Sequence, residues 1–181
     1  MMPKDENADD QRIDPEETIR IAGIVRESIV DGPGLRFAVF GQGCPHRCRG
    51  CHNESTHDFD GGYDCLQKTI LAEIDKNPLL TGVTFTGGEP FCQPKEFYEL
   101  GEEIKARGLD IVAYSGYTLE ELQEMSEKNE WIKKLLALID YLVDGPFILE
   151  ERDLTLKFRG SKNQRFLCMK KSVLQEEMYM V

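Results

Sequence analysis

Three cysteines, Cys44, Cys48 and Cys51, lie within eight residues of one another on a segment that also contains Pro45 and Gly50. Thiols held this closely on a short loop are arranged to share one metal centre. A structural zinc ion and an electron-transfer iron–sulfur cube each take four protein ligands. Three thiolates on a four-iron cube leave one iron open to an outside ligand. The C-x3-C-x2-C spacing therefore favours a cluster that takes part in chemistry.

Other metal chemistry stays open on spacing alone. A zinc site is satisfied by the three cysteines together with His46, His52 or His57. A four-thiolate electron carrier would have to recruit Cys65 or Cys92, which we interpret as small apolar side chains, as we do Cys168. A disulfide scaffold is disfavoured, because only 6 of 181 residues are cysteine and no signal peptide precedes them.

Composition narrows the class of protein. With 40% hydrophobic and 30% charged residues, the chain is expected to form a single domain over residues 19–181 after an acidic, disordered tail at 1–18. The net charge of −11 argues against a nucleic-acid partner, and no apolar run is long enough for a membrane span. Reduced thiols available to a metal are typical of the cytoplasm. Residues 152–171 are strongly basic, which fits a solvated surface or a docking surface equally well.

The elements around the cysteine loop alternate between strands and helices. The hydrophobic pattern predicts strands at 19–25, 35–40, 83–86, 109–114 and 141–143. It predicts helices at 64–74, 97–104, 118–125 and 131–138. Asp64 is expected to cap the first helix, Gly108 to end the second, and Thr118 with Glu121 to form a capping box for the third.

This alternation is typical of an α/β fold, with right-handed crossovers and a parallel sheet covered by helices. A complete eight-unit barrel needs ~250 residues, so we expect a partial barrel that is open on one side. Loops that follow parallel strands lie at the same edge of the sheet. That edge would bring the cysteine loop together with the Gly87-Gly88 pair, Glu89, Ser115 and Asp144.

Together these segments resemble the radical S-adenosylmethionine superfamily. The cysteine motif followed by Gly-Gly-Glu-Pro at 87–90 carries this resemblance. VDGPGLR at 30–36 and CHN at 51–53 are similar to the glycyl-radical-enzyme activases of the superfamily. SGYT at 115–118, VDGPF at 143–147 and FRGSKNQR at 158–165 are similar to the branch that activates anaerobic ribonucleoside-triphosphate reductases. The resemblance covers residues 18–168.

The resemblance implies a 4Fe-4S cluster on Cys44, Cys48 and Cys51, with S-adenosylmethionine bound at the fourth iron inside a laterally open barrel of the radical S-adenosylmethionine type. Gly87, Gly88 and Glu89 would hold the methionine amino group. Ser115 and Asp144 would contact the ribose or the methionine end. The residue before the third cysteine is often aromatic in this superfamily; here it is Gly50, so an adenine contact would come from the backbone beside Cys51, with His52 as a supplement.

The implied activity is that of an oxidoreductase. An external one-electron donor such as flavodoxin would reduce the cluster, and a 5′-deoxyadenosyl radical would take hydrogen from a glycine of the large catalytic subunit of anaerobic ribonucleotide reductase. Asp31 and Arg36, on the turn before the cluster, are candidate contacts for the glycine loop, and Arg159 in the basic segment is a candidate contact for the ligand carboxylate. Two alternatives remain: an activase of another glycyl radical enzyme such as pyruvate formate-lyase, and a non-catalytic zinc-binding interaction domain.

Overall fold

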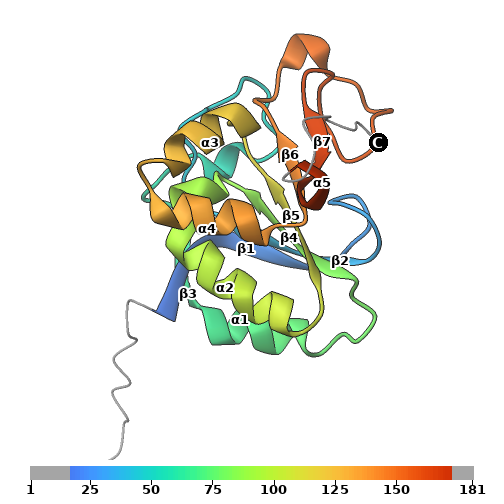
Figure 1. The fold of residues 1–181 in the computed structure, drawn as a ribbon. Coiled ribbons are helices and arrows are strands. Elements are labelled where there is room, and N and C mark those ends of the chain that lie inside the picture. The colour runs from blue at the N-terminus through green and yellow to red at the C-terminus, as the bar shows by residue number, and fades with distance from the viewer. Residues whose placement is uncertain (1–16, 173–181) are drawn as a thin grey trace, which may run out of the picture.

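Seven strands form one sheet in the order β3-β1-β2-β4-β5-β6-β7 (Figure 1). The computed structural model describes residues 17–172, so residues 1–16 of the predicted acidic tail lie outside the described residues. The strands are β1 (Thr18–Ser28), β2 (Arg36–Gly41), β3 (Tyr63–Leu66), β4 (Gly82–Gly87), β5 (Asp110–Tyr114), β6 (Tyr141–Asp144) and β7 (Arg165–Cys168). The α-helices are α1 (Gln67–Ile74), α2 (Pro94–Ala106), α3 (Leu119–Ser126), α4 (Glu130–Leu138) and α5 (Met169–Ser172). Short 3-10 turns are η2 (Glu54–Thr56), η3 (Pro90–Cys92) and η4 (Leu149–Glu151).

The sheet is mixed. Strands β2, β4, β5 and β6 run parallel to one another, as the alternation of strands and helices predicts. The other strands are antiparallel: β1 pairs with β2 and β3, and β7 pairs with β6. The α/β class is thus confirmed, and the parallel centre carries antiparallel strands toward both edges.

Alternation along the strands separates two sides of the sheet. On β5, Ile111 and Ala113 face the main core, whereas Val112 belongs to a second cluster with Val143 and Phe166. The buried centre of the sheet is therefore apolar on both faces, as expected for parallel strands. Figure 1 shows α1, α2, α3 and α4 gathered on one side of the sheet, which leaves the other side to the loops.

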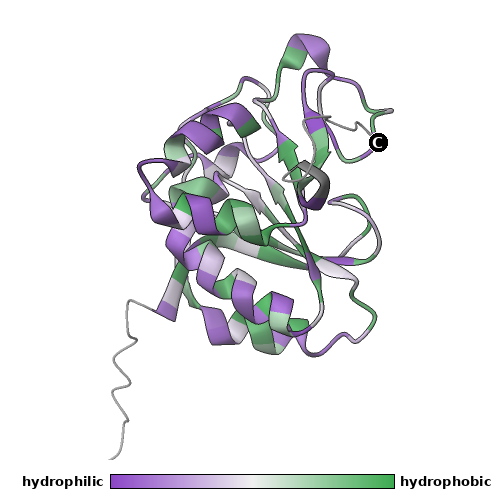
Figure 2. Cartoon of the chain, viewed as in Figure 1, coloured by the Kyte–Doolittle hydropathy of each residue, from purple (hydrophilic) through white to green (hydrophobic). Residues whose placement is uncertain are grey.

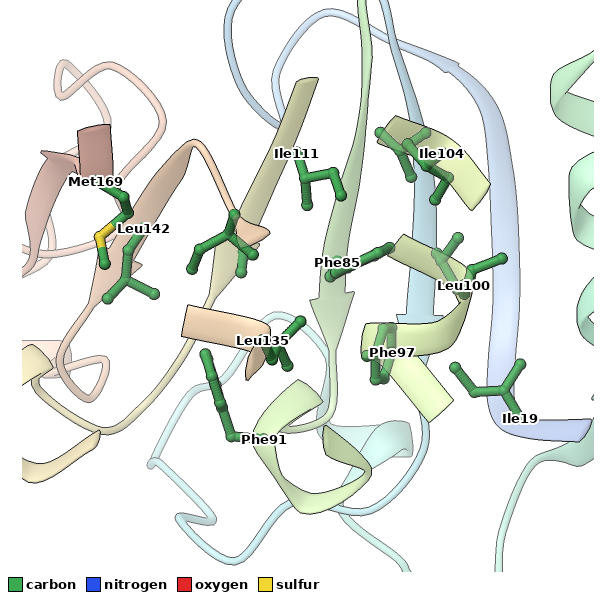
Figure 3. Packing of buried hydrophobic residues seen from close by; sticks show 14 of the residues in the cluster. Ile19, Phe85, Phe91, Phe97, Leu100, Ile104, Ile111, Leu135, Leu142 and Met169 are labelled. Carbon is green, nitrogen blue, oxygen red and sulfur yellow. The ribbon is translucent and has the colours of Figure 1, made fainter. Parts of the chain in front are cut away.

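The main core lies between the helices and the sheet. Figure 3 shows Phe97, Leu100 and Ile104 of α2 against Phe85 of β4, and the rings of Phe85 and Phe97 are 4.8 Å apart. Their spacing along α2 places all three on one helical face. The opposite face of α2 is polar, as the purple segments of Figure 2 show. Truncating Phe97, which is fully buried, to Ala is expected to cost about 3–5 kcal/mol of stability.

Local signals were confirmed at two helices and failed at one. Gly108 follows α2 with φ 76°, and Thr118 with Glu121 forms the capping box of α3. Asp64, however, does not cap a helix: it lies in β3, where it pairs with Arg20 of β1. Helix α1 begins only at Gln67, because residues 63–66 pair with the free edge of β1. None of the helices in residues 17–172 is long and apolar enough to cross a membrane.

Candidate functional site

The loops after the four parallel strands line one cavity of about 760 Å³. The cysteine loop follows β2; Gly88 follows Gly87, the last residue of β4; Ser115 follows β5; and Gly145 follows β6. The sequence prediction that these loops meet is confirmed, since all of them contribute lining residues. The volume falls within the roughly 300–1,000 Å³ that is usual for small-molecule sites.

The three cysteines open onto this cavity as free, partly buried thiols. The loop is held at its base, where the Cys44 N–H donates to the carbonyl of His57 (3.2 Å). It turns through Arg47 and Gly50 in left-handed conformations, with φ 47° and 73°. Burial raises the pKa of Cys44 and, separately, the pKa of Cys51. The surroundings alone therefore favour neutral thiols, and a bound cation would be needed to hold these two as thiolates.

The donor set fits a cluster better than a single ion. Among residues 17–172, no three His, Cys, Asp or Glu side chains lie close enough together to hold one metal ion. A zinc ion needs all its sulfur ligands at about 2.3 Å, whereas a cube receives each thiolate on a different iron. A backbone donor also reaches the sulfur of the third cysteine, since the Asn53 N–H lies 3.4 Å from Cys51 Sγ. Such hydrogen bonds are one means of setting a cluster's potential.

The Gly87-Gly88 pair lets β4 pack directly on the start of the cysteine loop. A Cβ on Gly87 would lie 2.7 Å from Cα of Phe40, and a Cβ on Gly88 would lie 2.5 Å from the carbonyl oxygen of Gly43. Gly87 also has φ 88°, which other residues adopt at a cost. The Gly88 N–H donates to the carbonyl of Gly41 (2.8 Å). Close backbone packing therefore accounts for both glycines, and both also line the cavity.

Glu89 joins three loops behind the cavity wall rather than lining it. Its side chain is 1% exposed. One oxygen accepts from the Phe91 N–H (3.1 Å), and the other accepts from the Gly116 N–H (2.8 Å) and lies 3.0 Å from His46 Nε2. The Ser115 hydroxyl lies 3.1 Å from both oxygens. Groups of the chain itself therefore surround this carboxylate, and the sequence-based assignment of an ammonium contact to Glu89 stays a prediction.

His46 connects the cysteine loop to the loop after β5. Besides its contact with Glu89, its ring packs edge-on against Tyr117 at 4.4 Å. Gly116 makes room for it, because a Cβ there would lie 2.3 Å from the ring. Sequence reasoning treated His46 only as a spare zinc ligand and missed this role; Gly116 beside Ser115 is a weak signal for it.

Asp144 also lies behind the cavity, with 1% exposure. It accepts from the Leu119 N–H at the start of α3 (2.7 Å) and from Arg165 Nε (3.0 Å). Arg165 binds Glu120 as well, and this ion pair lowers the pKa of Glu120. The side chain thus ties β6 to α3 and β7, and its predicted ribose contact stays a prediction.

The remaining predicted contacts are divided between the cavity and its surroundings. Ser115 and His52 line the cavity, and the His52 ring lies 5.7 Å from that of Phe147. Gly50 is not a lining residue; a Cβ there would lie 3.1 Å from Leu149. Its left-handed φ of 73° gives a conformational reason for glycine before the third cysteine.

Two further segments of the cavity wall were predicted only in part, through the candidate contacts Asp31 and Arg159, which both line the cavity. Residues 154–160 contribute a whole loop, and residues 29–31 contribute the turn that follows β1. Tyr114 also lines the cavity, and its hydroxyl donates to the carbonyl of Phe158 (2.8 Å). Two buried nitrogens of lining residues, His57 Nε2 and Arg159 Nε, have no hydrogen-bond partner among the described residues. The sequence signals for the 154–160 loop were its basic charge and the FRGSKNQR motif, which begins at Phe158.

Arg36 is fully buried. A contact with a partner protein would require its side chain to reach the surface, which it does not. Its guanidinium donates to Thr84 Oγ1 (2.7 Å), to the carbonyl of Val83 (2.7 Å) and to that of Pro33 (3.1 Å). Thr84 in turn donates to the carbonyl of Asp31 (2.7 Å). Arg36 therefore fixes the 31–34 turn against β4. The expected contact between Arg36 and a partner loop is corrected to a structural role.

Comparison with known proteins gives consistent matches over most of the chain. The family model described as "4Fe-4S single cluster domain" matches residues 30–167. An anaerobic ribonucleoside-triphosphate reductase-activating protein of Vibrio cholerae is 36% identical over 144 residues, which cover 75% of this chain and 89% of that protein. The proteins of the same name from Escherichia coli K12 and phage T4 are each 33% identical over 75% of this chain, and over 90% and 85% of their own lengths.

Proposed function

The chain belongs to the family of anaerobic ribonucleoside-triphosphate reductase-activating proteins, and we propose that it makes a glycyl radical on the large subunit of such a reductase at the cavity described above. It is a 4Fe-4S enzyme of this family. The observation that carries the proposal is that Cys44, Cys48 and Cys51 open onto one cavity with the loops of all four parallel strands. The zinc-binding alternative and the activase of pyruvate formate-lyase have no comparable support, since the relatives reported above carry the reductase activator's name.

When bound, the cluster and S-adenosylmethionine supply the chemistry, which is reductive cleavage of the sulfonium to methionine and a 5′-deoxyadenosyl radical. The chain supplies placement and exclusion of water. Cys44, Cys48 and Cys51 are proposed to hold the cluster. Gly87, Gly88 and Ser115 are proposed to contact the methionine end, with the backbone at Gly50 and the ring of His52 on the adenine side. Glu89 and Asp144 are proposed to act from behind, by fixing Ser115 and the loop after β6.

We also infer that the sheet acts as a partial barrel of the radical S-adenosylmethionine type. Its two edges, β3 and β7, do not pair with each other, and helices cover the side opposite the cavity. An open side suits a protein substrate, because a polypeptide loop has to reach the reacting atoms. When the glycine Cα–H is already held against the reacting atom, the entropy of bringing the two together has been lost on binding. This placement lowers the barrier of the reaction by up to ~7–11 kcal/mol.

The remaining partners follow from the chemistry. A one-electron donor such as flavodoxin is proposed to reduce the cluster. The acidic net charge of −11 supports a protein partner rather than nucleic acid. Thiols that must stay reduced for iron support a cytoplasmic location.

The experiment is anaerobic reconstitution with iron and sulfide, reduction, and addition of S-adenosylmethionine with the reductase large subunit. Iron, sulfide, 5′-deoxyadenosine and methionine would be quantified, and the glycyl radical measured by electron paramagnetic resonance. Wild type is expected to bind about four irons and to give all three products, whereas Cys48→Ala gives none. A protein that binds one zinc and no iron, or that cleaves S-adenosylmethionine without forming a glycyl radical, would contradict the proposal.

A further inference from the structure

We propose that Ile29, Val30 and Leu154 form a docking rim for the glycine-bearing segment of the reductase. This inference rests on the proposed function, since it names the surface through which that substrate reaches the cavity. The three side chains come from two loops that are distant in sequence, the turn after β1 and the 154–160 loop. All three line the cavity.

The rim is unusually apolar for exposed surface. Ile29, Val30 and Leu154 are 75%, 70% and 76% exposed. Single exposed apolar residues are normal on proteins. Among the described residues, however, three of the seven exposed large apolar side chains belong to this one cavity. Both loops lie on the same side of the molecule in Figure 1, and both carry green, hydrophobic segments in Figure 2. Apolar side chains gathered at the mouth of a site are typical of an interaction surface.

The backbone beneath Ile29 and Val30 is held in place. The Ser28 hydroxyl donates to Asp31 Oδ2 (2.5 Å) and accepts from the Val30 N–H (3.3 Å). The carbonyl of Asp31 accepts from Thr84 Oγ1 (2.7 Å) on β4. These side chains are therefore presented to solvent by an anchored turn.

The loop that carries Leu154 is anchored at three points. Its base closes through the bridge between Arg152 and Ser161 and through the Asp153 N–H, which donates to the carbonyl of Gly160 (3.1 Å). Tyr114 holds its far end through the carbonyl of Phe158 (2.8 Å). Because both parts of the rim are preorganised, a partner would bind without first ordering them.

The charges beside the rim indicate a polypeptide of defined character. Lys157 and Arg159 line the same cavity, and neither has a carboxylate within ion-pair distance among residues 17–170. The rim thus offers apolar side chains next to unpaired cations. We infer an extended segment with apolar side chains near its glycine and an acidic residue that reaches Lys157. A second copy of this chain is disfavoured, because each copy carries a net charge of −11.

The test compares full-length, reconstituted wild type with Ile29→Asp and Leu154→Asp. Leu79→Asp is the matched control, since Leu79 is 74% exposed but does not line the cavity. The probe is the large subunit of the anaerobic ribonucleoside-triphosphate reductase, titrated against each protein, with the Kd and the glycyl radical yield measured together. Each rim variant is expected to raise the Kd and the half-saturating reductase concentration at least tenfold, or ~1.4 kcal/mol. The plateau yield and the iron content are expected to stay at the wild-type level, and the control to behave as wild type.

The outcomes separate this inference from the proposed function. If wild type makes the radical and the rim variants titrate like Leu79→Asp, the rim is overturned while the function stands. A lower plateau at an unchanged half-saturating concentration also overturns it, because the residues would then act on the reaction and not on docking. Wild-type dimers in sedimentation that dissociate in Leu154→Asp would identify a second copy as the occupant and overturn it too. A wild type that makes no radical overturns both proposals.

Discussion

Replacing Glu89 with Gln is expected to destabilise the folded chain, because this carboxylate joins three loops. The side chain is 1% exposed, and every contact it makes is to groups that donate. Those groups are the Phe91 N–H, the Gly116 N–H, the Ser115 hydroxyl and the ring of His46, at 2.8–3.1 Å. A carboxylate accepts from all of them at once.

The size of the expected loss of stability follows from the hydrogen bonds that a glutamine side chain is unable to accept. Its amide group has one oxygen, so the NH₂ must face either the Phe91 N–H or the Gly116 N–H. A buried donor left without an acceptor costs ~1–3 kcal/mol, and losing the charge weakens the bonds that remain. We therefore expect a loss of about 2–4 kcal/mol. In a chain of this length, that corresponds to a fall in Tm of roughly 4–16 °C.

The assay is anaerobic thermal unfolding followed by circular dichroism, on proteins without the cluster, so that metal binding makes no contribution. Glu124→Gln is the control, because Glu124 is an exposed glutamate of α3. The control is expected to unfold as wild type does. An unchanged Tm in Glu89→Gln, together with weaker binding of S-adenosylmethionine to the reconstituted protein, would refute this reasoning and assign the carboxylate to the ligand.

Four further substitutions test other parts of the structure. Burial alone would raise the pKa of Asp140, but hydrogen bonds from two lysines and a backbone N–H lower it. Asp140→Asn is therefore expected to lose roughly 1–3 kcal/mol at neutral pH. This loss of stability is expected in full above about pH 3.9, the ordinary pKa of an Asp side chain, and it disappears as the pH falls through the lowered pKa of Asp140. Urea titrations at several pH values measure it, and a loss that stays constant down to acid pH would contradict the prediction. Gly87→Ala is expected to fail to accumulate as folded protein, because its Cβ would lie 2.7 Å from Cα of Phe40; a wild-type Tm would count against the close packing. Cys65→Ala and Cys92→Ala are expected to keep the full iron content, and loss of iron in either would revive a four-thiolate cluster.

Local sequence signals predicted most of the elements correctly. The parallel strands, the capping box at Thr118 and the end of α2 at Gly108 depend on hydrophobic period and turn chemistry within a few residues. The antiparallel strands β3 and β7 were missed. Each consists of four residues, and each is a strand because a free sheet edge is available to it, in β1 and β6 respectively. Asp64 is an example: its residue type favours a helix cap, but in the fold it belongs to the edge strand β3.

The site was predictable to a different degree for its two kinds of residue. Residue type and spacing alone indicate a metal site at Cys44, Cys48 and Cys51. The structure places all three at one cavity. The sequence gives no such signal for the rim residues Ile29 and Leu154, because an apolar residue in a loop is common and does not by itself indicate a binding surface. Only exposure together with a shared cavity distinguishes them, and both are properties of the folded chain.

His46 and Glu89 show why such a site is difficult to interpret from activity alone. Their contact, at 3.0 Å, ties the loop that carries the cysteines to Glu89, and the Ser115 hydroxyl donates to the same carboxylate. Because one carboxylate positions both loops, a substitution there would disturb cluster and ligand together and look like the loss of a ligand contact. The stability measurement separates the two explanations, since a ligand contact contributes nothing to the unfolding of a protein without ligand. Polar residues next to a metal motif are therefore better assigned by what already surrounds them in the fold than by what their type could bind.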